Sequence, residues 1–281
     1  ELGSAYQRFG SKVTVVEMLP KLLPLMDAEL TGLVTAQLEA AGMEILTSST
    51  VLSVKDTPQG AEVKVKTPAG ERVISAEKVL LSVGRGPNTA SLGLDKAGIK
   101  AEKGYIQVNE RMETNVPGVY AVGDCNGKLM LAHAAMAMGE AAAENAMGGS
   151  STFNPDESPS CAYVGPEFAC VGLTEERCRE LGIEYKVGRF PTSANGRSLV
   201  SGATDGMIKV VAGARYGEIL GVHILAERAT DLIEEAALAI KLEATLDELI
   251  GTIHCHPTVA EALHEAALAA EGRAIHIPNK K

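Results

Sequence analysis

The sequence predicts an α/β protein whose first part contains a parallel sheet and whose last part is an α+β domain. Residues 12–17 (KVTVVE) form a β-branched run after a short helical segment, which is typical of a buried parallel strand. Beyond a polar, Pro- and Ser-rich segment at residues 150–160, short strand patterns alternate with helical ones. This second pattern is typical of an antiparallel sheet covered by helices on one face, so we expect a domain boundary at the polar segment.

The composition is that of a globular protein and argues against several classes of partner. The chain has 281 residues, enough for two or three domains, and its formal net charge is −10. This charge argues against nucleic acid or an anionic membrane as the main partner. The five cysteines show neither CxxC nor CxxxxC spacing, and no cluster of ligands completes a metal site. We therefore expect reduced thiols in a reducing compartment and no bound metal.

In the first part, the predicted elements follow one another as helix, strand, helix and further strands. The helical pattern of residues 1–9 ends at Gly10, and that of residues 28–41 ends at Gly42. The predicted strands are 12–17, 44–47, 50–54, 62–66 and 78–83. A βαβ unit begins with a strand and a glycine-rich turn, and neither precedes the first helix. We therefore expect the sequence to begin inside a dinucleotide-binding unit.

Two positions in this part are candidates for contacts with a dinucleotide. Glu17 ends a strand at the point where this fold places the acid that accepts the adenosine ribose hydroxyls. An acid at this position favours NAD over NADP, although many strands end in glutamate. Gly84 follows the strand predicted at 78–83, and glycine there would let the backbone approach a ligand. An ordinary crossover turn explains Gly84 equally well.

A second candidate site follows a short apolar strand predicted at Val119–Val122. Gly123 permits close approach of the backbone, and Asp124 can accept hydrogen bonds from polyol or ribose hydroxyls. After the segment 128–133, an alanine-rich helix is expected to extend through Met147. Backbone N–H groups at the start of this helix can bind a ring carbonyl or a partly negative ring. The alternative is simply a well-packed helix.

The last part carries the pattern of a sheet with helices. The predicted strands are 162–163, 169–172, 185–190, 207–212 and 219–225, and the predicted helices are 175–181, 229–242 and 258–270. Residues 213–217 (GARYG) are expected to form the hairpin turn between the last two strands.

The segment His256-Pro257-Thr258, followed by Glu261, bears most directly on chemistry. A carboxylate can hold one imidazole nitrogen and leave the other free to move a proton. Proline suits the first position of a helix, so we expect His256 at or just outside the start of the helix predicted at 258–270. Five positions along a helix do not share a face, so pairing with Glu261 requires His256 to fold back. A capping histidine and a solvated glutamate are an equally good interpretation of the residues alone.

Four segments resemble, in order, the flavin-dependent pyridine nucleotide–disulfide oxidoreductases, and within that family the dihydrolipoyl dehydrogenases. The segments are ELGSAYQRFGSKVTVVE (1–17), LSVGRGPNT (81–89), TNVPGVYAVGDC (114–125) with KLMLAH (128–133), and HCHPTVAEALHEAA (254–267). The resemblance covers essentially the whole chain. It implies partial nucleotide-binding Rossmann-like domains followed by an α+β dimerisation domain. The implied boundaries are 1–86 for NAD binding, 87–150 for FAD binding and 151–281 for the interface.

The resemblance also implies cofactors and roles for individual residues. The implied NAD contacts are Glu17, Val51 and Gly84, and the implied FAD contacts are Gly123, Asp124, Met130, Leu131, Ala132 and His133. His256 would be the base that deprotonates a dithiol substrate, and Glu261 would orient it. His254 and His223 have no implied role, so structural roles are expected for both.

The reaction implied by the resemblance is oxidation of protein-bound dihydrolipoamide to lipoamide, in a homodimer formed through residues 155–281. The implied partners are lipoyl domains of 2-oxoacid dehydrogenase or glycine cleavage complexes. The implied location is the cytoplasm, or the mitochondrial matrix in a eukaryote. The family's redox disulfide has no counterpart among the five cysteines, so we expect a C-terminal portion that is inactive alone.

Two alternatives stay open. A glutathione-reductase-like enzyme shares the His-Pro-Thr segment but would prefer NADPH, which Glu17 disfavours. A non-catalytic dimerisation or nucleotide-binding fragment is the alternative from another class, and a flavin spectrum of the purified protein would distinguish it from the enzyme.

Overall fold

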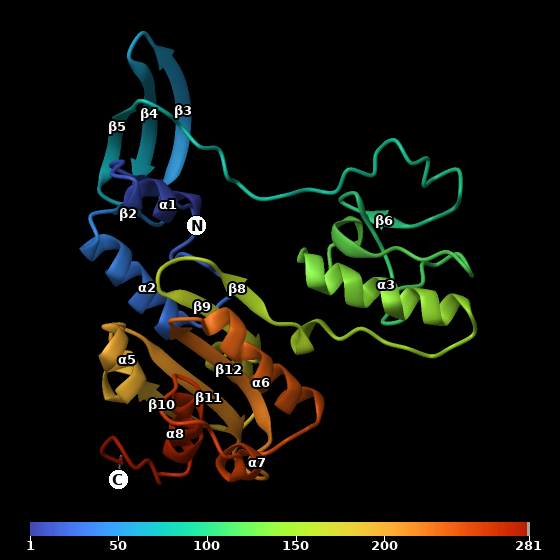
Figure 1. Ribbon diagram of the computed structural model, residues 1–281. Helices are drawn as coiled ribbons and strands as arrows, with labels where there is room; N and C mark the ends of the chain where they lie inside the picture. The colour runs from blue at the N-terminus through green and yellow to red at the C-terminus, as the bar shows by residue number, and fades with distance from the viewer. Residues whose placement is uncertain (280–281) are drawn as a thin grey trace. The chain divides into compact units, whose positions relative to one another are not determined.

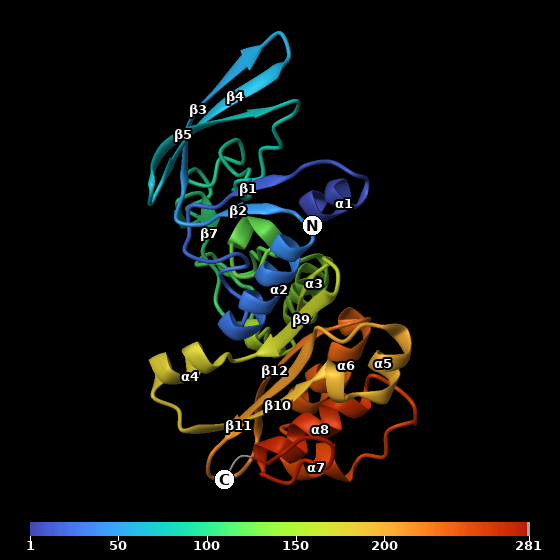
Figure 2. The same ribbon diagram turned by 90° about the vertical axis from the view of Figure 1, so that its left-hand side faces the viewer.

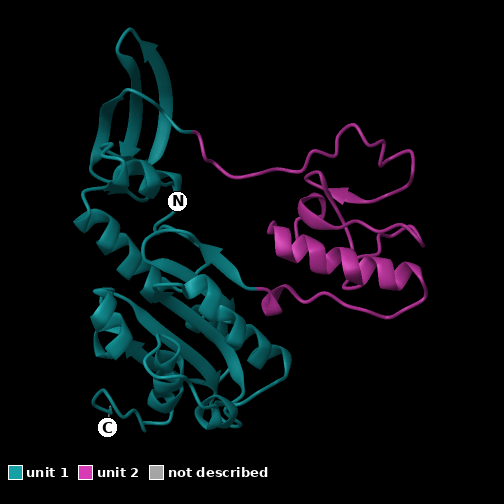
Figure 3. Cartoon of the chain, viewed as in Figure 1, with its two compact units in different colours: residues 1–80, 159–281 teal, residues 81–158 magenta. Residues whose placement is uncertain are grey.

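The computed structural model describes residues 1–279, and the chain forms two compact units. The first unit combines residues 1–80 with residues 159–281, and the second consists of residues 81–158 (Figure 3). Figure 1 labels most of the helices and strands of both units. Helices and strands are mixed throughout, which confirms the predicted α/β class. Within residues 1–279, every helix is too short or too polar to span a bilayer.

The first unit begins with a two-stranded parallel sheet and its helices. The elements are α1 (Leu2–Arg8), β1 (Thr14–Val16), α2 (Ala28–Ala40) and β2 (Glu44–Leu46). β1 pairs with β2 in parallel, as the β-branched run predicted. α2 begins where the Asp27 side chain accepts a hydrogen bond from the Leu30 N–H at 3.1 Å. Leu30, Val34 and Leu38 recur every four residues and form the buried face of this helix.

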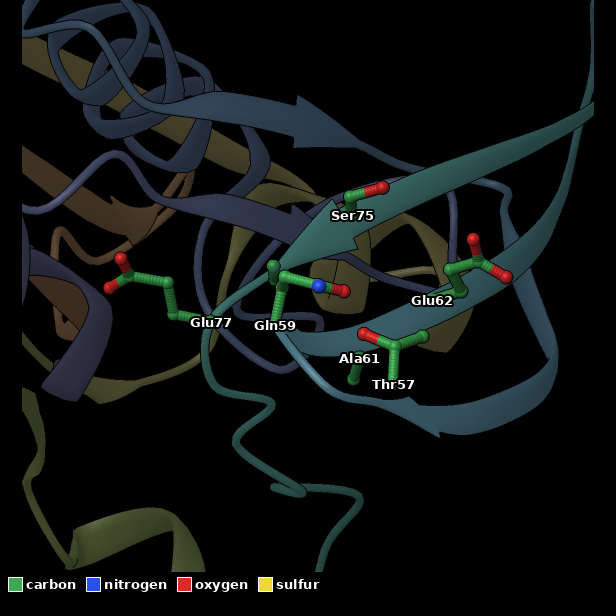
Figure 4. Close-up of a pocket in the computed structure, with 7 residues that line it drawn as sticks. Thr57, Gln59, Ala61, Glu62, Ser75 and Glu77 are labelled. Atoms are coloured by element: carbon green, nitrogen blue, oxygen red, sulfur yellow. The ribbon is translucent and has the colours of Figure 1, made fainter.

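An antiparallel three-stranded sheet follows. Its strands are β3 (Thr50–Thr57), β4 (Gly60–Thr67) and β5 (Gly70–Ala76). β5 was not predicted, because its first half, GER, is polar. A pocket of about 300 Å³ at one end of this sheet is lined by Thr57, Gln59, Ala61, Glu62, Ser75, Ala76 and Glu77 (Figure 4). None of the residues predicted to bind a cofactor lines this pocket.

Two strands predicted from the sequence do not form. Residues 78–83 adopt no regular structure, and the side chains of Leu81 and Val83 are 79% and 84% exposed. Their apolar run predicted a buried parallel strand, but the described parallel sheet contains only β1 and β2. Val119–Val122 forms a single bridge, between Tyr120 and Glu113, rather than a strand. An apolar run becomes a strand only where a neighbouring strand satisfies its backbone hydrogen bonds.

A five-stranded antiparallel sheet forms the rest of the first unit, in the order β10-β11-β12-β9-β8. The strands are β8 (Ser160–Ala162), β9 (Glu167–Gly172), β10 (Tyr185–Pro191), β11 (Met207–Gly213) and β12 (Ile219–Ala226). The helices are α4 (Glu175–Leu181), η3 (Thr192–Ala194), α5 (Gly196–Ser201), α6 (Ala229–Lys241), α7 (Leu246–Gly251) and α8 (Glu261–Ala270). The pairing of β11 with β12 confirms the predicted hairpin.

Helices cover both faces of this sheet, whereas the sequence predicted helices on one face. Val171 and Ile224 belong to a core that includes residues of α6 and α8, which lie along the sheet in Figure 2. On the opposite face, Phe168 and Leu225 pack with Leu30 of α2. Successive residues of a strand point to opposite faces, and both sets of side chains here are apolar. Because both faces of the sheet are apolar, each face must pack against helices that exclude water from it.

The second unit is built around one long helix. Its elements are β6 (Ala101–Glu102), β7 (Tyr105–Ile106), η1 (Gly123–Asn126), α3 (Ala132–Ala146) and η2 (Pro155–Glu157). α3 confirms the predicted alanine-rich helix. Met112 and Phe153 pack against Ala134, Met138 and Ala142, which lie on one side of α3. The small alanine side chains allow the irregular chain to approach this helix closely.

Candidate active site

His256 lies in the irregular segment between α7 and α8, and its imidazole contacts Glu261. Nδ1 of His256 lies 2.9 Å from Oε1 of Glu261. The side chain of His256 is 79% exposed, whereas that of Glu261 is 29% exposed. The imidazole therefore folds back onto the first residue of α8, and the two side chains meet despite their five-residue spacing.

The helix that follows His256 starts later than the sequence predicted. α8 begins at Glu261 rather than at residue 258, so Pro257 is not its first residue. Oε2 of Glu261 accepts a hydrogen bond from the Thr258 N–H at 2.8 Å, the three-residue reach back that is typical of a helix start. The Thr258 hydroxyl donates to the Cys255 carbonyl oxygen at 2.7 Å. These bonds hold residues 255–258 in a turn of their own ahead of the helix.

The Glu261 carboxylate is ionised at neutral pH. Burial opposes ionisation, but hydrogen bonds from the Thr258 N–H and the His256 imidazole outweigh burial and lower the pKa of Glu261 below its usual value. A charged carboxylate beside Nδ1 favours a proton on that nitrogen and leaves Nε2 to exchange protons with another molecule. The exposed imidazole and its carboxylate therefore have the geometry of a general base and its orienting group.

Glu17 and Val51 lie on neighbouring segments of the first unit. The Glu17 N–H donates to the Leu46 carbonyl oxygen, and the Glu17 carbonyl oxygen accepts from the Ser49 N–H, both at 2.9 Å. These bonds place Glu17 beside the residues that lead into β3, where Val51 is 44% exposed. Oε1 of Glu17 accepts a hydrogen bond from the Leu19 N–H at 2.7 Å. The carboxylate is thus held at the carboxyl end of β1, a position that suits an acceptor of ribose hydroxyls.

Gly84 and Asp124 lie close together in the second unit, a proximity that the sequence did not predict. Nε of Arg85 lies 3.3 Å from Oδ2 of Asp124, whose side chain is 46% exposed. Arg85 follows Gly84 directly, so the glycine turn approaches the acid. Gly84 has a φ of 101°, a backbone conformation that favours glycine. The signal that could have revealed the contact is the positive charge of Arg85, which directly follows Gly84 and is opposite to the charge of Asp124.

Gly123 and the segment Met130–His133 meet at the start of α3. Gly123 has a φ of 74°, and a Cβ added there would lie 3.3 Å from the Cβ of Ala135. Leu131, the N-cap residue of α3, is apolar and makes no side-chain hydrogen bond to the helix start. The first N–H groups of a helix carry a partial positive charge. This end of α3 can therefore accept a ring carbonyl or a partly negative ring beside Gly123 and Asp124.

The cysteines and possible metal ligands offer no further site among residues 1–279. All five cysteines are free thiols, and burial raises the pKa of Cys170 to about 12. No group of three or more His, Cys, Asp or Glu side chains in this described part could hold a metal ion.

Two proteins named dihydrolipoyl dehydrogenase are similar to the whole chain in sequence. The chain is 46% identical over its full length to a dihydrolipoyl dehydrogenase of Thermus scotoductus, of which it covers 61%. It is 42% identical over 99% of its length to the mitochondrial dihydrolipoyl dehydrogenase of Pisum sativum, of which it covers 56%. The chain therefore spans less than two thirds of the length of these relatives.

A solved structure with a similar fold and two family profiles also match the chain. The solved structure of LpdA from Mycobacterium tuberculosis shares 29% identity and a TM-score of 0.88, over 95% of this chain and 58% of LpdA. Residues 1–139 match the family described as pyridine nucleotide-disulphide oxidoreductase, and residues 158–267 match the dimerisation domain of that family. Because profiles of one family match both its first and its last part, the chain belongs to the pyridine nucleotide-disulphide oxidoreductase family.

Proposed function

We propose that this chain forms part of a dihydrolipoyl dehydrogenase, which oxidises protein-bound dihydrolipoamide to lipoamide with FAD and NAD⁺. The observation that carries the proposal is the His256–Glu261 pair, an exposed imidazole held by an ionised carboxylate. The names of the relatives at 42% and 46% identity support the choice of substrate. The dimerisation-domain match supports a homodimer through residues 155–281. Its partners would be lipoyl domains of 2-oxoacid dehydrogenase or glycine cleavage complexes, in the cytoplasm or the mitochondrial matrix.

In this proposal His256 acts on a thiol of the substrate. Nε2 would accept the thiol proton, and Glu261 would stabilise the resulting imidazolium through its contact with Nδ1. The thiolate rather than the thiol is the nucleophile in disulfide exchange, so removal of the proton prepares the substrate to donate electrons to a redox disulfide. When bound, FAD and NAD supply the electron and hydride transfer chemistry.

The proposal assigns residues to each cofactor. The start of α3 at Met130–His133, with Gly123 and Asp124 beside it, would hold FAD. Glu17 and Val51, which lie on neighbouring segments of the first unit, would hold the adenosine end of NAD. The contact of Gly84 with the nicotinamide end is proposed from the resemblance alone. We accordingly assign residues 1–86 to NAD binding, 87–150 to FAD binding and 151–281 to the interface.

The choice of substrate is tested on the holoenzyme, meaning the complete gene product that contains this chain, purified with its flavin. Dihydrolipoamide with NAD⁺ is expected to give NADH, whereas glutathione disulfide with NADPH is expected to give no turnover. The reverse preference would favour the glutathione-reductase-like alternative. The 281-residue chain on its own is expected to be inactive, because its five cysteines are free and none is assigned the role of the redox disulfide.

Replacement of Asp124 is expected to weaken flavin binding. Asp124→Ala removes an acceptor for flavin hydroxyls, and a hydrogen bond to a charged group contributes about 1.5–3 kcal/mol. The amount of FAD retained after gel filtration of the holoenzyme measures the effect. Asp156→Ala, which removes an exposed acid from the same unit, is the matched control. If the Asp124 variant retained flavin as well as the Asp156 variant does, Asp124 would not be a flavin contact.

Replacement of Glu17 is expected to raise KM for NAD⁺ while kcat changes little. The proposed contact with the ribose is remote from the reacting atoms, so it is equally strong in the ground state and the transition state. Steady-state kinetics with varied NAD⁺ measure the change, and Glu39→Ala on the exposed side of α2 is the control. A preference of the unmodified holoenzyme for NADP⁺ would contradict the role of Glu17.

A further inference from the structure

A second histidine–carboxylate pair lies two residues ahead of His256. Nε2 of His254 lies 2.9 Å from Oε1 of Glu235 on α6, and Nδ1 of His254 lies 3.0 Å from the carbonyl oxygen of Thr252. The side chain of His254 is 7% exposed, in contrast to 79% for His256. The two neighbouring histidines therefore differ in kind. The imidazole of His254 is nearly buried and both its nitrogens have a partner, whereas the imidazole of His256 is exposed and contacts Glu261 through Nδ1.

Both atoms that face the His254 ring are hydrogen-bond acceptors. Each ring nitrogen has one such acceptor within hydrogen-bond distance, Glu235 at Nε2 and the Thr252 carbonyl oxygen at Nδ1. The contact with Glu235 joins the ring to α6. The pair is therefore suited to act as an anchor between α6 and the segment that carries His256.

The segment that carries His256 depends on such anchors. Residues 253–258 form no helix or strand. On the far side of His256, the Asn195 side-chain amide donates to the carbonyl oxygen of Thr258 at 3.0 Å, and Asn195 is itself buried at the start of α5. His256 thus lies between two side-chain attachments, one to α6 through His254 and one to α5 through Asn195.

We propose that His254 and Glu235 are positioning residues that hold the imidazole of His256 against Glu261. This inference rests on the proposed role of His256 as the base. Without the attachment to α6, residues 253–256 would shift, and the 2.9 Å contact between His256 and Glu261 would be lost for part of the time. Small displacements of a reacting group reduce the rate of a step that depends on exact alignment.

The test replaces His254 by phenylalanine, which keeps a ring in the same space beside His264 but removes both hydrogen bonds. In the holoenzyme, His254→Phe is expected to lower kcat with dihydrolipoamide on the order of 10- to 100-fold, as loss of an outer supporting contact does at other sites, with little change in KM. Glu235→Gln keeps an oxygen acceptor for the ring and is expected to cost less. His276→Gln removes a comparable pair, with Glu265 at 2.9 Å, and serves as the matched control.

A second readout reports on geometry without any turnover. Holoenzyme labelled with ¹⁵N-histidine gives an imidazole signal for His256, which is identified by its loss in His256→Gln. The neutral ring is expected to carry its proton on Nδ1 in the unmodified protein, because Glu261 accepts there. In His254→Phe the signal is expected to shift toward the Nε2-protonated form of an unrestrained imidazole.

The outcomes separate this inference from the proposed function. Unmodified kcat together with an unchanged His256 signal in His254→Phe would overturn the positioning role. If the unmodified holoenzyme failed to oxidise dihydrolipoamide, the proposed function would fail, and the imidazole signal alone would decide whether His254 positions His256. If His254→Phe did not fold, the same two readouts would be taken on Glu235→Ala, which removes the acceptor, and unmodified values of both would overturn the inference.

Discussion

Replacement of His256 by glutamine is expected to slow flavin reduction by dihydrolipoamide by about 10²–10⁴-fold, the usual contribution of a positioned general base. The fold, the flavin content and the dimer should persist, because His256 is 79% exposed and lies outside every helix and strand. Stopped-flow measurement of flavin absorbance in the holoenzyme determines the rate. Glu261→Gln is expected to cost less, since Glu261 orients the imidazole and stabilises its cation without moving the proton itself.

The control for this prediction is His276→Gln, which removes another exposed histidine with a carboxylate partner. Its rate of flavin reduction should equal that of the unmodified holoenzyme. Unmodified rates in His256→Gln at neutral pH would show that His256 only occupies the turn ahead of α8 and has no part in the chemistry.

Replacement of Lys209 by methionine is expected to destabilise the first unit by about 3–5 kcal/mol, the cost of removing one partner from a buried ion pair. Nζ of Lys209 lies 2.8 Å from Asp27, 2.9 Å from Glu29 and 2.5 Å from Glu175. Lys209 is 1% exposed and Asp27 is fully buried, so the substitution leaves a carboxylate in the interior without its cation. Arg189 retains its contacts with Glu29 and Glu175, which limits the loss at those two acids.

Chemical denaturation of the holoenzyme measures the free energy of unfolding. Lys64→Met, which breaks an exposed ion pair with Glu71, is the control and is expected to destabilise the protein far less, because water screens an exposed pair. Burial opposes the charged forms, but the ion pairs outweigh it, so that the pKa of Asp27 is lowered and that of Lys209 is raised. The stabilisation is therefore lost as pH falls through the lowered pKa of Asp27 or rises through the raised pKa of Lys209. Equal stability of the two variants at neutral pH would contradict this account.

The ion pairs of Lys209 with Asp27 and Glu29 join two stretches of chain that are distant in the sequence. Asp27 and Glu29 stand at the start of α2, and Lys209 stands in the middle of β11. The sequence predicts the strands of the five-stranded sheet and the helix α2, but it does not predict that α2 packs on the second face of this sheet. A lysine inside the apolar run MIKVVAG was the available signal, because a buried lysine requires acidic partners from a neighbouring element.

Two short segments show which local sequence patterns are sufficient to predict secondary structure. α7 was missed, although Thr245 and Glu248 form the reciprocal hydrogen bonds of a capping box, a pattern that the sequence carries. Residues 78–83 were predicted as a strand from apolar composition alone, and they form none because pairing depends on a neighbour that composition does not reveal. At these positions, a capping-box pattern in the sequence therefore carries more information about secondary structure than apolar composition does.

The candidate active site was predictable in its residue types and not in its geometry. The contact of His256 with Glu261 depends on a turn that ends before α8, and the start of α8 was predicted three residues too early. The approach of Arg85 to Asp124 depends on the fold of the whole second unit, since the two residues are far apart in the sequence. The anchoring of His254 by Glu235 likewise required the packing of α6 beside the segment that carries His256.

The pH dependence of flavin reduction tests most directly whether His256 is the base. In the unmodified holoenzyme, the rate should rise less steeply with pH than in the variant, because in the proposed mechanism the imidazole removes the thiol proton. In His256→Gln, the rate should rise about tenfold per pH unit below the pKa of the substrate thiol, since only the thiolate already present can react. The two profiles should therefore converge at high pH. Parallel profiles at every pH would contradict the assignment of His256 as the base.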